Sequence, residues 1–155
     1  MNIIELNTLT PSQTTDMLGL MRELTADCRV TADMLQNTLS TPGTHLFAAL
    51  DAAGCIIGCA TLGVYCSPTG LKGAVEDVVV AQSHRGQGLG RKLLETIIDY
   101  ARQQLGDVDL HLTSRPQRIA ANALYQSLGF EKRETNFYRM KIRRSRTMPP
   151  KNSYA

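Results

Sequence analysis

A glycine-rich segment carries the clearest chemical signal in the sequence. It reads His84-Arg85-Gly86-Gln87-Gly88-Leu89-Gly90-Arg91, with glycine at alternate positions. Glycines at this spacing allow the main chain to turn sharply and leave several N–H groups facing one concavity. The apolar residues that follow predict a helix directly after the loop, and the start of a helix attracts anions. The segment therefore predicts a binding site for a phosphate group.

Two common phosphate-binding loops have a different spacing. A Walker A loop needs Gly-Lys followed by Ser or Thr, whereas this chain continues Gly90-Arg91-Lys92-Leu93. The dinucleotide fingerprint needs GxGxxG, whereas these glycines follow GxGxG. The acidic residue that the fingerprint places about 20 positions further on is also missing. The spacing thus argues against nucleotide hydrolysis and against a dinucleotide-binding fold.

Hydrophobic periodicity places the loop between a strand and a helix. The valine-rich segment 74–81 is predicted to be a central strand buried on both faces. Leucine and isoleucine then recur at helical spacing over 89–105, and Gly106 closes that helix. The same criteria predict a strand at 109–113 and a helix at 119–128.

The rest of the chain reads as further strands and helices. Thr10, Pro11 and Gln13 form the start signal of a helix that extends to about Cys28. The predicted order is β-α-α-β-β-β-α-β-α-β-β, which makes an α/β (α+β) domain with a mixed sheet and helices on both faces. The remaining elements are strands at 3–6, 45–50, 55–65, 130–134 and 137–142, and a helix at 31–39. Residues 67–70 interrupt the strand pattern.

Composition indicates one soluble domain. Of 155 residues, 43% are hydrophobic and 20% are charged. The net charge of +3 is unevenly placed, because residues 131–155 hold eight basic and two acidic side chains. We predict a single domain over 1–142 and a flexible basic tail over 143–155, in which Arg143, Arg144, Arg146 and Lys151 act as solubilising charges. Neither nucleic acid nor a membrane is an expected partner, and a cytoplasmic location is expected.

Three segments together resemble the GCN5-related N-acetyltransferases (GNAT), over about residues 3–142. They are the strand Val75 to Val80, the loop Arg85 to Gly90, which matches R/Q-x-x-G-x-G/A, and the helix Asn122 to Phe130. The resemblance implies a mostly antiparallel sheet of six to seven strands with a splayed central strand pair and about four helices. It also implies acetyl-CoA as cosubstrate, no metal, and a homodimer.

The same resemblance assigns roles to individual residues. Tyr125 is expected to be the general acid that protonates the leaving thiolate, and Glu76 the base or water-relay residue. The Glu76-Asp77 pair is partly like the strand motif of glucosamine 6-phosphate N-acetyltransferase. Strand alternation predicts that these two carboxylates point to opposite faces, so that only one faces the acceptor. The implied coenzyme-binding residues are Val78, Val79, Val80, Arg85, Gly86, Gln87, Gly88, Leu89, Gly90, Arg91 and Asn122.

The expected reaction is direct transfer of the acetyl group to a primary amine within a ternary complex. The acceptor stays open between an amino sugar, another small amine, and a peptide or protein amine. An amino-sugar phosphate would need basic residues, and the first 70 residues offer only Arg22 and Arg29. Arg115 and Arg118 could bind a phosphate of the coenzyme or remain solvated charges. The alternative from another class is a non-catalytic acyl-CoA sensor or scaffold, which would have no use for Tyr125.

Overall fold

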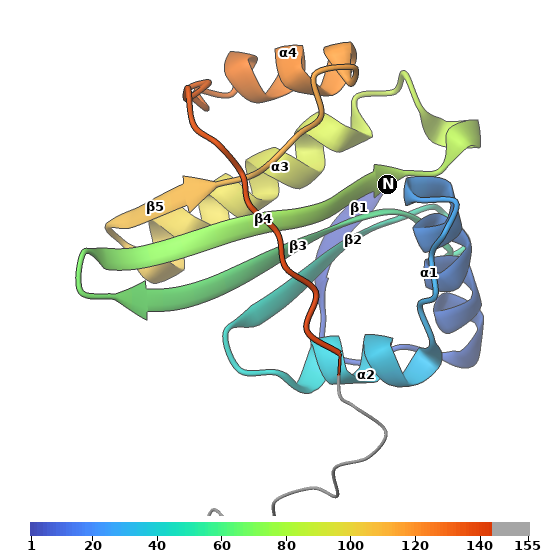
Figure 1. Ribbon diagram of the computed structural model, residues 1–155. Helices are drawn as coiled ribbons and strands as arrows, with labels where there is room; N and C mark the ends of the chain where they lie inside the picture. Colours follow the sequence, from blue (N-terminus) through green and yellow to red (C-terminus); the bar gives the residue numbers. More distant parts are fainter. Residues whose placement is uncertain (144–155) are drawn as a thin grey trace, which may run out of the picture.

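The computed structural model describes residues 1–143, which form one mixed sheet with helices on both faces (Figure 1). The strand order is β1-β2-β3-β4-β5, with antiparallel neighbours up to β4 and a parallel β4–β5 pair. Arg144, Arg146 and Lys151 of the predicted tail lie outside the described residues. The strands are β1 (Asn2–Leu6), β2 (Thr44–Leu50), β3 (Ile56–Ser67), β4 (Gly70–Val80) and β5 (Val108–His111).

The four α-helices have the predicted order. They are α1 (Pro11–Leu24), α2 (Ala32–Ser40), α3 (Leu89–Tyr100) and α4 (Ile119–Ser127), with a short 3-10 turn η1 (Gln82–His84) before α3 and a π-helical turn η2 (Ala101–Leu105) after it. Thr10 and Gln13 cap the start of α1 reciprocally, side chain to main chain, at 3.2 and 3.1 Å. None of the helices within residues 1–143 is long and apolar enough to cross a membrane.

The sheet separates two apolar layers. Helices α1 and α2 cover one face, where Met17, Leu20 and Met21 are buried against β2, β3 and β4. Helix α3 covers the other face and buries Leu93 and Ile97, and α4 lies beyond it (Figure 1). The valines of β4 contribute to both layers: Val75 packs with the α3 layer and Val79 with the α1 layer. This strand is therefore the central strand that its composition predicted.

Strands β4 and β5 are paired over only four residues. The register runs from Leu71 opposite Val108 to Ala74 opposite His111, where β5 ends. From Val75 onward, the edge of β4 that faced β5 has no strand beside it. The pairing of β4 with β5 therefore ends at Ala74, and along the described part of the chain the second half of β4 has an unpaired edge.

A β-bulge interrupts β4 on its other side. Cys59 is opposite Val79 and Thr61 is opposite Glu76, so that one residue of β3 faces two residues of β4. Asp77 lies in this bulge with φ of +51°, a left-handed conformation that is uncommon for a residue other than glycine. The bulge redirects the side chains of β4 at the point where the strand pair splays.

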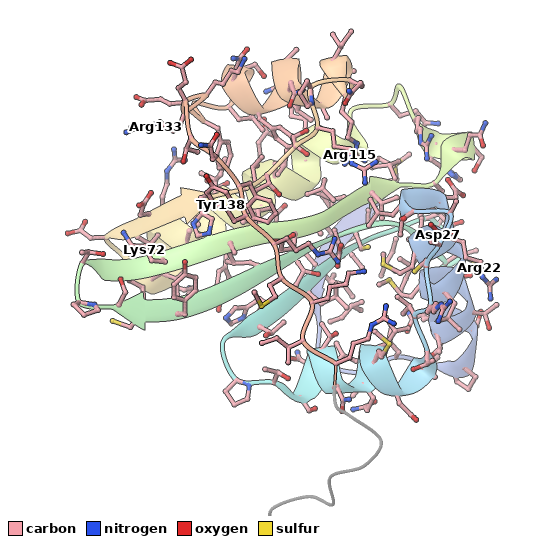
Figure 2. All side chains as sticks on the ribbon, viewed as in Figure 1. Arg22, Asp27, Lys72, Arg115, Arg133 and Tyr138 are labelled. Atoms are coloured by element: carbon pink, nitrogen blue, oxygen red, sulfur yellow. The ribbon has the colours of Figure 1, made fainter. Side chains whose placement is uncertain are left out.

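The two strands predicted at 130–134 and 137–142 are wrong. After α4 the described chain forms no further strand, and the sheet has five strands instead of six to seven. Residues 131–143 are exposed and pass in front of the sheet, where Figure 2 labels Tyr138. Alternation of apolar and polar residues does produce the predicted pattern there. It cannot reveal whether a sheet edge is available to pair with it.

Several predicted boundaries also moved. Helix α1 ends at Leu24 instead of Cys28. The predicted break at 67–70 is a tight hairpin turn, and β3 and β4 therefore extend to Ser67 and Gly70. The predicted strand at 109–113 lies at Val108–His111, and its shorter length creates the open edge of β4.

Candidate functional site

The glycine loop leaves main-chain N–H groups without partners. Gly86 and Gly88 have φ of +77° and +75°, a conformation that other residues rarely adopt. Gly88 is the N-cap of α3, and no side chain accepts a hydrogen bond from the first turn. The first bond of the helix runs from Lys92 N to Gly88 O at 3.1 Å, so the N–H groups of the three residues before it remain free of helical partners.

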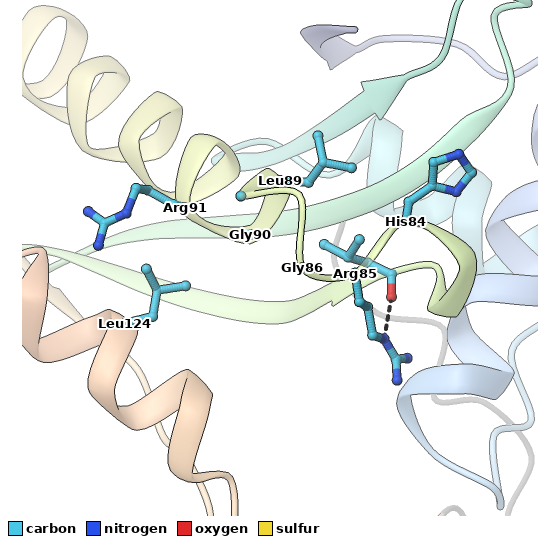
Figure 3. A pocket seen from close by; sticks show the side chains of 9 residues that line it. His84, Arg85, Gly86, Leu89, Gly90, Arg91 and Leu124 are labelled. Atoms are coloured by element: carbon cyan, nitrogen blue, oxygen red, sulfur yellow. Dashed lines mark hydrogen bonds between the residues drawn. The ribbon is translucent and has the colours of Figure 1, made fainter.

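These N–H groups border a cavity of about 280 Å³ (Figure 3). Val80 contributes from β4 and Leu124 from α4, so the cavity lies between the loop and both elements. Gly90 faces Leu124 closely, since a Cβ atom on Gly90 would lie 3.7 Å from Leu124 Cδ2. The other lining residues are His84, Arg85, Gly86, Gly88, Leu89 and Arg91. A helix start that lacks a cap and opens into a cavity is suited to an anion.

Two arginines beside this cavity bind to neighbouring elements. Arg85 donates from Nε to Val80 O at 2.9 Å (Figure 3) and from Nη2 to Glu23 Oε2 of α1 at 3.1 Å. Arg91 donates from Nη2 to Ser127 Oγ of α4 at 2.7 Å. Both side chains thus already have protein partners, and their charge adds to the positive end of α3.

The open edge of β4 offers main-chain groups next to this cavity. Ala81 N donates to Ile57 O at 2.9 Å, so at this position the main chain faces β3. Alternation then turns the N–H and C=O groups of Val80 toward the opposite, open edge. Of the three predicted valines, Val79 faces β3, Val80 has its carbonyl engaged by Arg85, and Val78 lies in the bulge.

Tyr125 of α4 belongs to the apolar layer beside α3 and is not among the lining residues of the first cavity. Its side chain is 8% exposed and its ring lies edge-on to Phe130, with 6.3 Å between ring centroids. Burial raises the pKa of the phenol, and the nearby Arg118 opposes this shift in part. The hydroxyl therefore keeps its proton at neutral pH.

Asn122 has a local structural role. Its Nδ2 donates to Arg115 O at 3.0 Å and more weakly to Pro116 O at 3.5 Å. The amide side chain therefore holds the loop between β5 and α4 against the first turn of α4. Arg115 and Arg118 belong to the same loop and are exposed.

A second cavity, of about 450 Å³, lies on the other face of the sheet between α1, α2 and β4. Asp77, which lies in the bulge, is the acidic residue that lines this cavity. Burial raises the pKa of the Cys59 thiol to about 12, so this thiol is not a nucleophile at neutral pH. The other lining residues are Met17, Met21, Val30, Met34, Leu35, Asn37, Thr38, Thr41, Thr44, Leu46 and Thr61.

The bulge places Glu76 and Asp77 on the same side of the sheet. Glu76 pairs with Thr61, so the two share a face, and Thr61 lines the second cavity together with Asp77. The opposite faces predicted from strict alternation are therefore wrong. Burial raises the pKa of both carboxyls, and for Glu76 the Asp77 charge adds to the increase while His111 opposes it.

Sequence reasoning found the loop and the glutamate but missed the second cavity. Its walls come from α1 and α2, whose methionines and threonines form an ordinary amphipathic pattern in the sequence. Asp77 was set aside because alternation directed it away from Glu76. A Glu-Asp pair inside a valine strand was the available signal, since consecutive charges in a buried strand fit poorly unless the strand bulges there.

Comparison with known proteins agrees with this geometry. Residues 12–130 match the family model described as "Acetyltransferase (GNAT) family". N-acetyltransferase 8 of Rattus norvegicus is 33% identical over 108 residues, which are 68% of this chain and 48% of that protein. The L-methionine sulfoximine/L-methionine sulfone acetyltransferase of Pseudomonas aeruginosa is 35% identical over 99 residues, 61% of this chain and 55% of that protein.

Solved structures share the fold. A putative acetyltransferase from Agrobacterium tumefaciens superposes with a TM-score of 0.78 at 23% identity, covering 91% of this chain and all of the other. The chain spans about half the length of the curated relatives it matches.

Proposed function

Because this chain belongs to the GNAT acetyltransferase family, we propose that it transfers the acetyl group of acetyl-CoA to a primary amine. The observation that carries the proposal is the meeting of two features at one place. The uncapped start of α3 opens into the first cavity, and the open edge of β4 lies beside it. A diphosphate joined to an extended amide chain needs an anion site next to unpaired main-chain groups.

The loop residues that the resemblance named are proposed to hold the diphosphate. The N–H groups of Leu89, Gly90 and Arg91 supply donors that require no side-chain movement. Gly86 and Gly88 allow the approach because they carry no Cβ atom. Val78 is proposed to bind the pantetheine amides at the β4 edge. Val80 can join it only if Arg85 releases the Val80 carbonyl.

Tyr125 is proposed as the general acid. The neutral amine attacks the thioester carbonyl, a C–N bond forms and the C–S bond breaks. The departing thiolate takes a proton from the Tyr125 hydroxyl. The nitrogen loses one proton as the amide forms, and this proton is proposed to return to the Tyr125 phenolate through water. The phenol is protonated before the reaction, although its raised pKa makes it a weaker proton donor than an exposed tyrosine.

Glu76 is proposed to accept the proton that the ammonium group loses, directly or through water. It lies on the face of the second cavity but is itself exposed, so it can pass the proton on to solvent. Its raised pKa makes it a better proton acceptor than an ordinary glutamate. Asp77 lines the cavity and is proposed to hold the ammonium group before deprotonation.

The acceptor is proposed to be a small amine that enters through the second cavity. The Pseudomonas aeruginosa relative is named for acetyl transfer to L-methionine sulfoximine and L-methionine sulfone, which are small amines that also carry a carboxylate. Its name supports the size of the proposed acceptor and not the absence of a carboxylate from it. An amino-sugar phosphate finds less support, because no basic side chain lines this cavity.

Release of free thiol from acetyl-CoA with a panel of amines tests the proposal. The parent protein should release thiol in step with acetylated amine, while Tyr125→Phe should be slowed strongly and Glu76→Gln moderately. Tyr65→Phe serves as the matched control, because Tyr65 is half exposed and lies outside both cavities.

Calorimetric binding of acetyl-CoA separates the alternatives. Tight binding without turnover of any amine would favour the sensor or scaffold. Absence of binding would refute the coenzyme assignment itself.

We also retain the homodimer as a proposal. Phe137, Tyr138, Met140 and Ile142 are 72 to 89% exposed, an unusual density of large apolar side chains for a solvated segment. Sedimentation of the full chain at several concentrations tests it, and a monomer at every concentration would refute it.

A further inference from the structure

We infer that the acceptor is a primary amine on an apolar chain that carries no anionic group. This inference rests on the proposed function and concerns the second cavity. The class includes arylalkylamines and thioether alkylamines. It excludes free amino acids and amino-sugar phosphates, whose amines have a carboxylate or phosphate nearby.

The wall of the cavity is mainly apolar. Met17 and Met21 come from one face of α1, Met34 and Leu35 from α2, and Leu46 from β2. All of these except Met34 are at most 6% exposed, whereas Met34 is 50% exposed and lies at the mouth. Methionine side chains are flexible and polarisable, so this wall suits apolar chains of varied shape.

Two of the four threonines in the wall have their hydroxyl protons engaged. Thr38 donates its hydroxyl to Met34 O at 2.9 Å, and Thr41 donates its hydroxyl to Asn37 O at 2.6 Å. The donors left for a ligand are neutral groups, the Asn37 amide and the hydroxyls of Thr44 and Thr61. A ligand carboxylate would therefore find neutral donors here and no cation.

The charge of the cavity has one sign. Asp77 lies in its wall, and among residues 1–143 no Lys, Arg or His lines it. Arg22, although it belongs to α1, points outward from that helix (Figure 2). A bound ammonium would gain an opposite charge at Asp77, which is itself exposed, while a carboxylate one carbon away would be repelled by that acid.

The ammonium end of such a ligand points toward the place of reaction. Asp77 and Val80 lie three residues apart on β4, and the first cavity reaches Val80 from the other side of the sheet. A chain bound along Met17 and Met21 with its nitrogen at Asp77 therefore approaches the splayed edge of β4. The apolar end remains toward Met34 and solvent.

Matched pairs of acceptors test this inference. Phenethylamine is compared with phenylalanine, and 3-(methylthio)propylamine with methionine, since each pair differs by one carboxylate. Glucosamine 6-phosphate represents anionic amino sugars. We expect kcat/KM for each amine to exceed that of its amino acid at least 100-fold, with no turnover of the sugar phosphate.

Two variants locate the preference in the cavity. Asp77→Asn should raise KM for phenethylamine at least tenfold, whereas Asp109→Asn, an exposed carboxylate of β5 outside both cavities, should leave it unchanged. Met34→Lys places a positive charge at the mouth, where the exposed side chain tolerates substitution. This substitution should reduce the ratio of kcat/KM for phenethylamine to kcat/KM for phenylalanine at least tenfold.

Acetyl-CoA binding is measured in parallel, so that failure of the proposed function can be distinguished from failure of the inference about the acceptor. No binding of acetyl-CoA refutes the proposed function. Binding with equal or better turnover of the amino acids, or with no turnover of either amine, overturns the inference alone. A ratio that Asp77→Asn and Met34→Lys both leave unchanged also overturns it, because the cavity then does not select the acceptor.

Discussion

The two cavities that β4 lines differ in the groups that they offer to the proposed ligands. The first offers main-chain N–H groups at the start of α3, and its glycines are essential because they lack side chains. The second offers side chains from α1, α2 and a bulge, and its main chain is engaged in regular structure. Backbone recognition depends on a short local motif, whereas side-chain recognition depends on how distant elements pack. The loop that borders the first cavity can therefore be predicted from the sequence, whereas the second cavity cannot.

The largest effect should come from blocking the backbone site. Gly88→Asp places a carboxylate at the N-cap of α3, where it would accept hydrogen bonds from the N–H groups intended for the diphosphate. Losing two charge-assisted bonds of about 1.5–3 kcal/mol each should weaken acetyl-CoA binding about 10³-fold. Calorimetric titration measures this change.

Gly54→Asp is the matched control for that variant. Gly54 also has a positive φ, +83°, and lies in the β2–β3 turn with no heavy atom within 4 Å of an added Cβ. Strain and added charge are thus similar at both positions. Equal loss of acetyl-CoA affinity in the two variants would contradict recognition by the α3 start.

A smaller effect should follow from Tyr125→Phe, which removes the proposed general acid. We expect kcat to fall about 100-fold, the range of a lost general acid, with KM for acetyl-CoA unchanged. The ring packing against Phe130 is kept, so the melting temperature should change little. Steady-state kinetics with circular dichroism melting checks both. A parallel increase in KM would instead mark Tyr125 as a coenzyme-binding residue.

On the acceptor side, Glu76→Gln should lower kcat/KM about tenfold at neutral pH. Because the pKa of Glu76 is raised, the parent should lose activity on acidification at a higher pH than an ordinary glutamate would dictate. The glutamine variant should lack this acidic limb. Rate profiles from pH 5 to 9 measure it, with Glu131→Gln, an exposed carboxylate, as the control. An unchanged acidic limb in Glu76→Gln would assign the base elsewhere.

The smallest expected effect concerns stability. Burial raises the pKa of Asp77, so the folded chain binds this proton more tightly than the unfolded chain. The ionised carboxylate therefore costs stability at neutral pH, and this cost disappears below the unfolded pKa of about 3.9. Asp77→Asn should melt slightly higher than the parent at pH 7 but not at pH 3.5. A lower melting temperature at pH 7 would show that Asp77 is a structural carboxylate.

The same contrast explains what sequence reasoning achieved. The capping box at Thr10, the strand with Val75 and Val79, and the helix from Leu89 are local patterns, and each formed as predicted. The bulge at Asp77 arises from the register between β3 and β4, which no single segment encodes. The prediction of strands at 130–134 and 137–142 is wrong for a related reason. A strand needs a neighbouring strand edge to pair with, and β5 extends over only four residues.

Helix α1 contacts the glycine loop and also lines the second cavity. The Glu23 carboxylate near the end of α1 accepts hydrogen bonds from the Arg85 side chain and from the main-chain N–H of Gln82. Met17 and Met21 of the same helix line the second cavity. A phosphate bound in the first cavity would compete with Glu23 for Arg85. Occupancy of the first cavity would then change a contact that positions the helix lining the second.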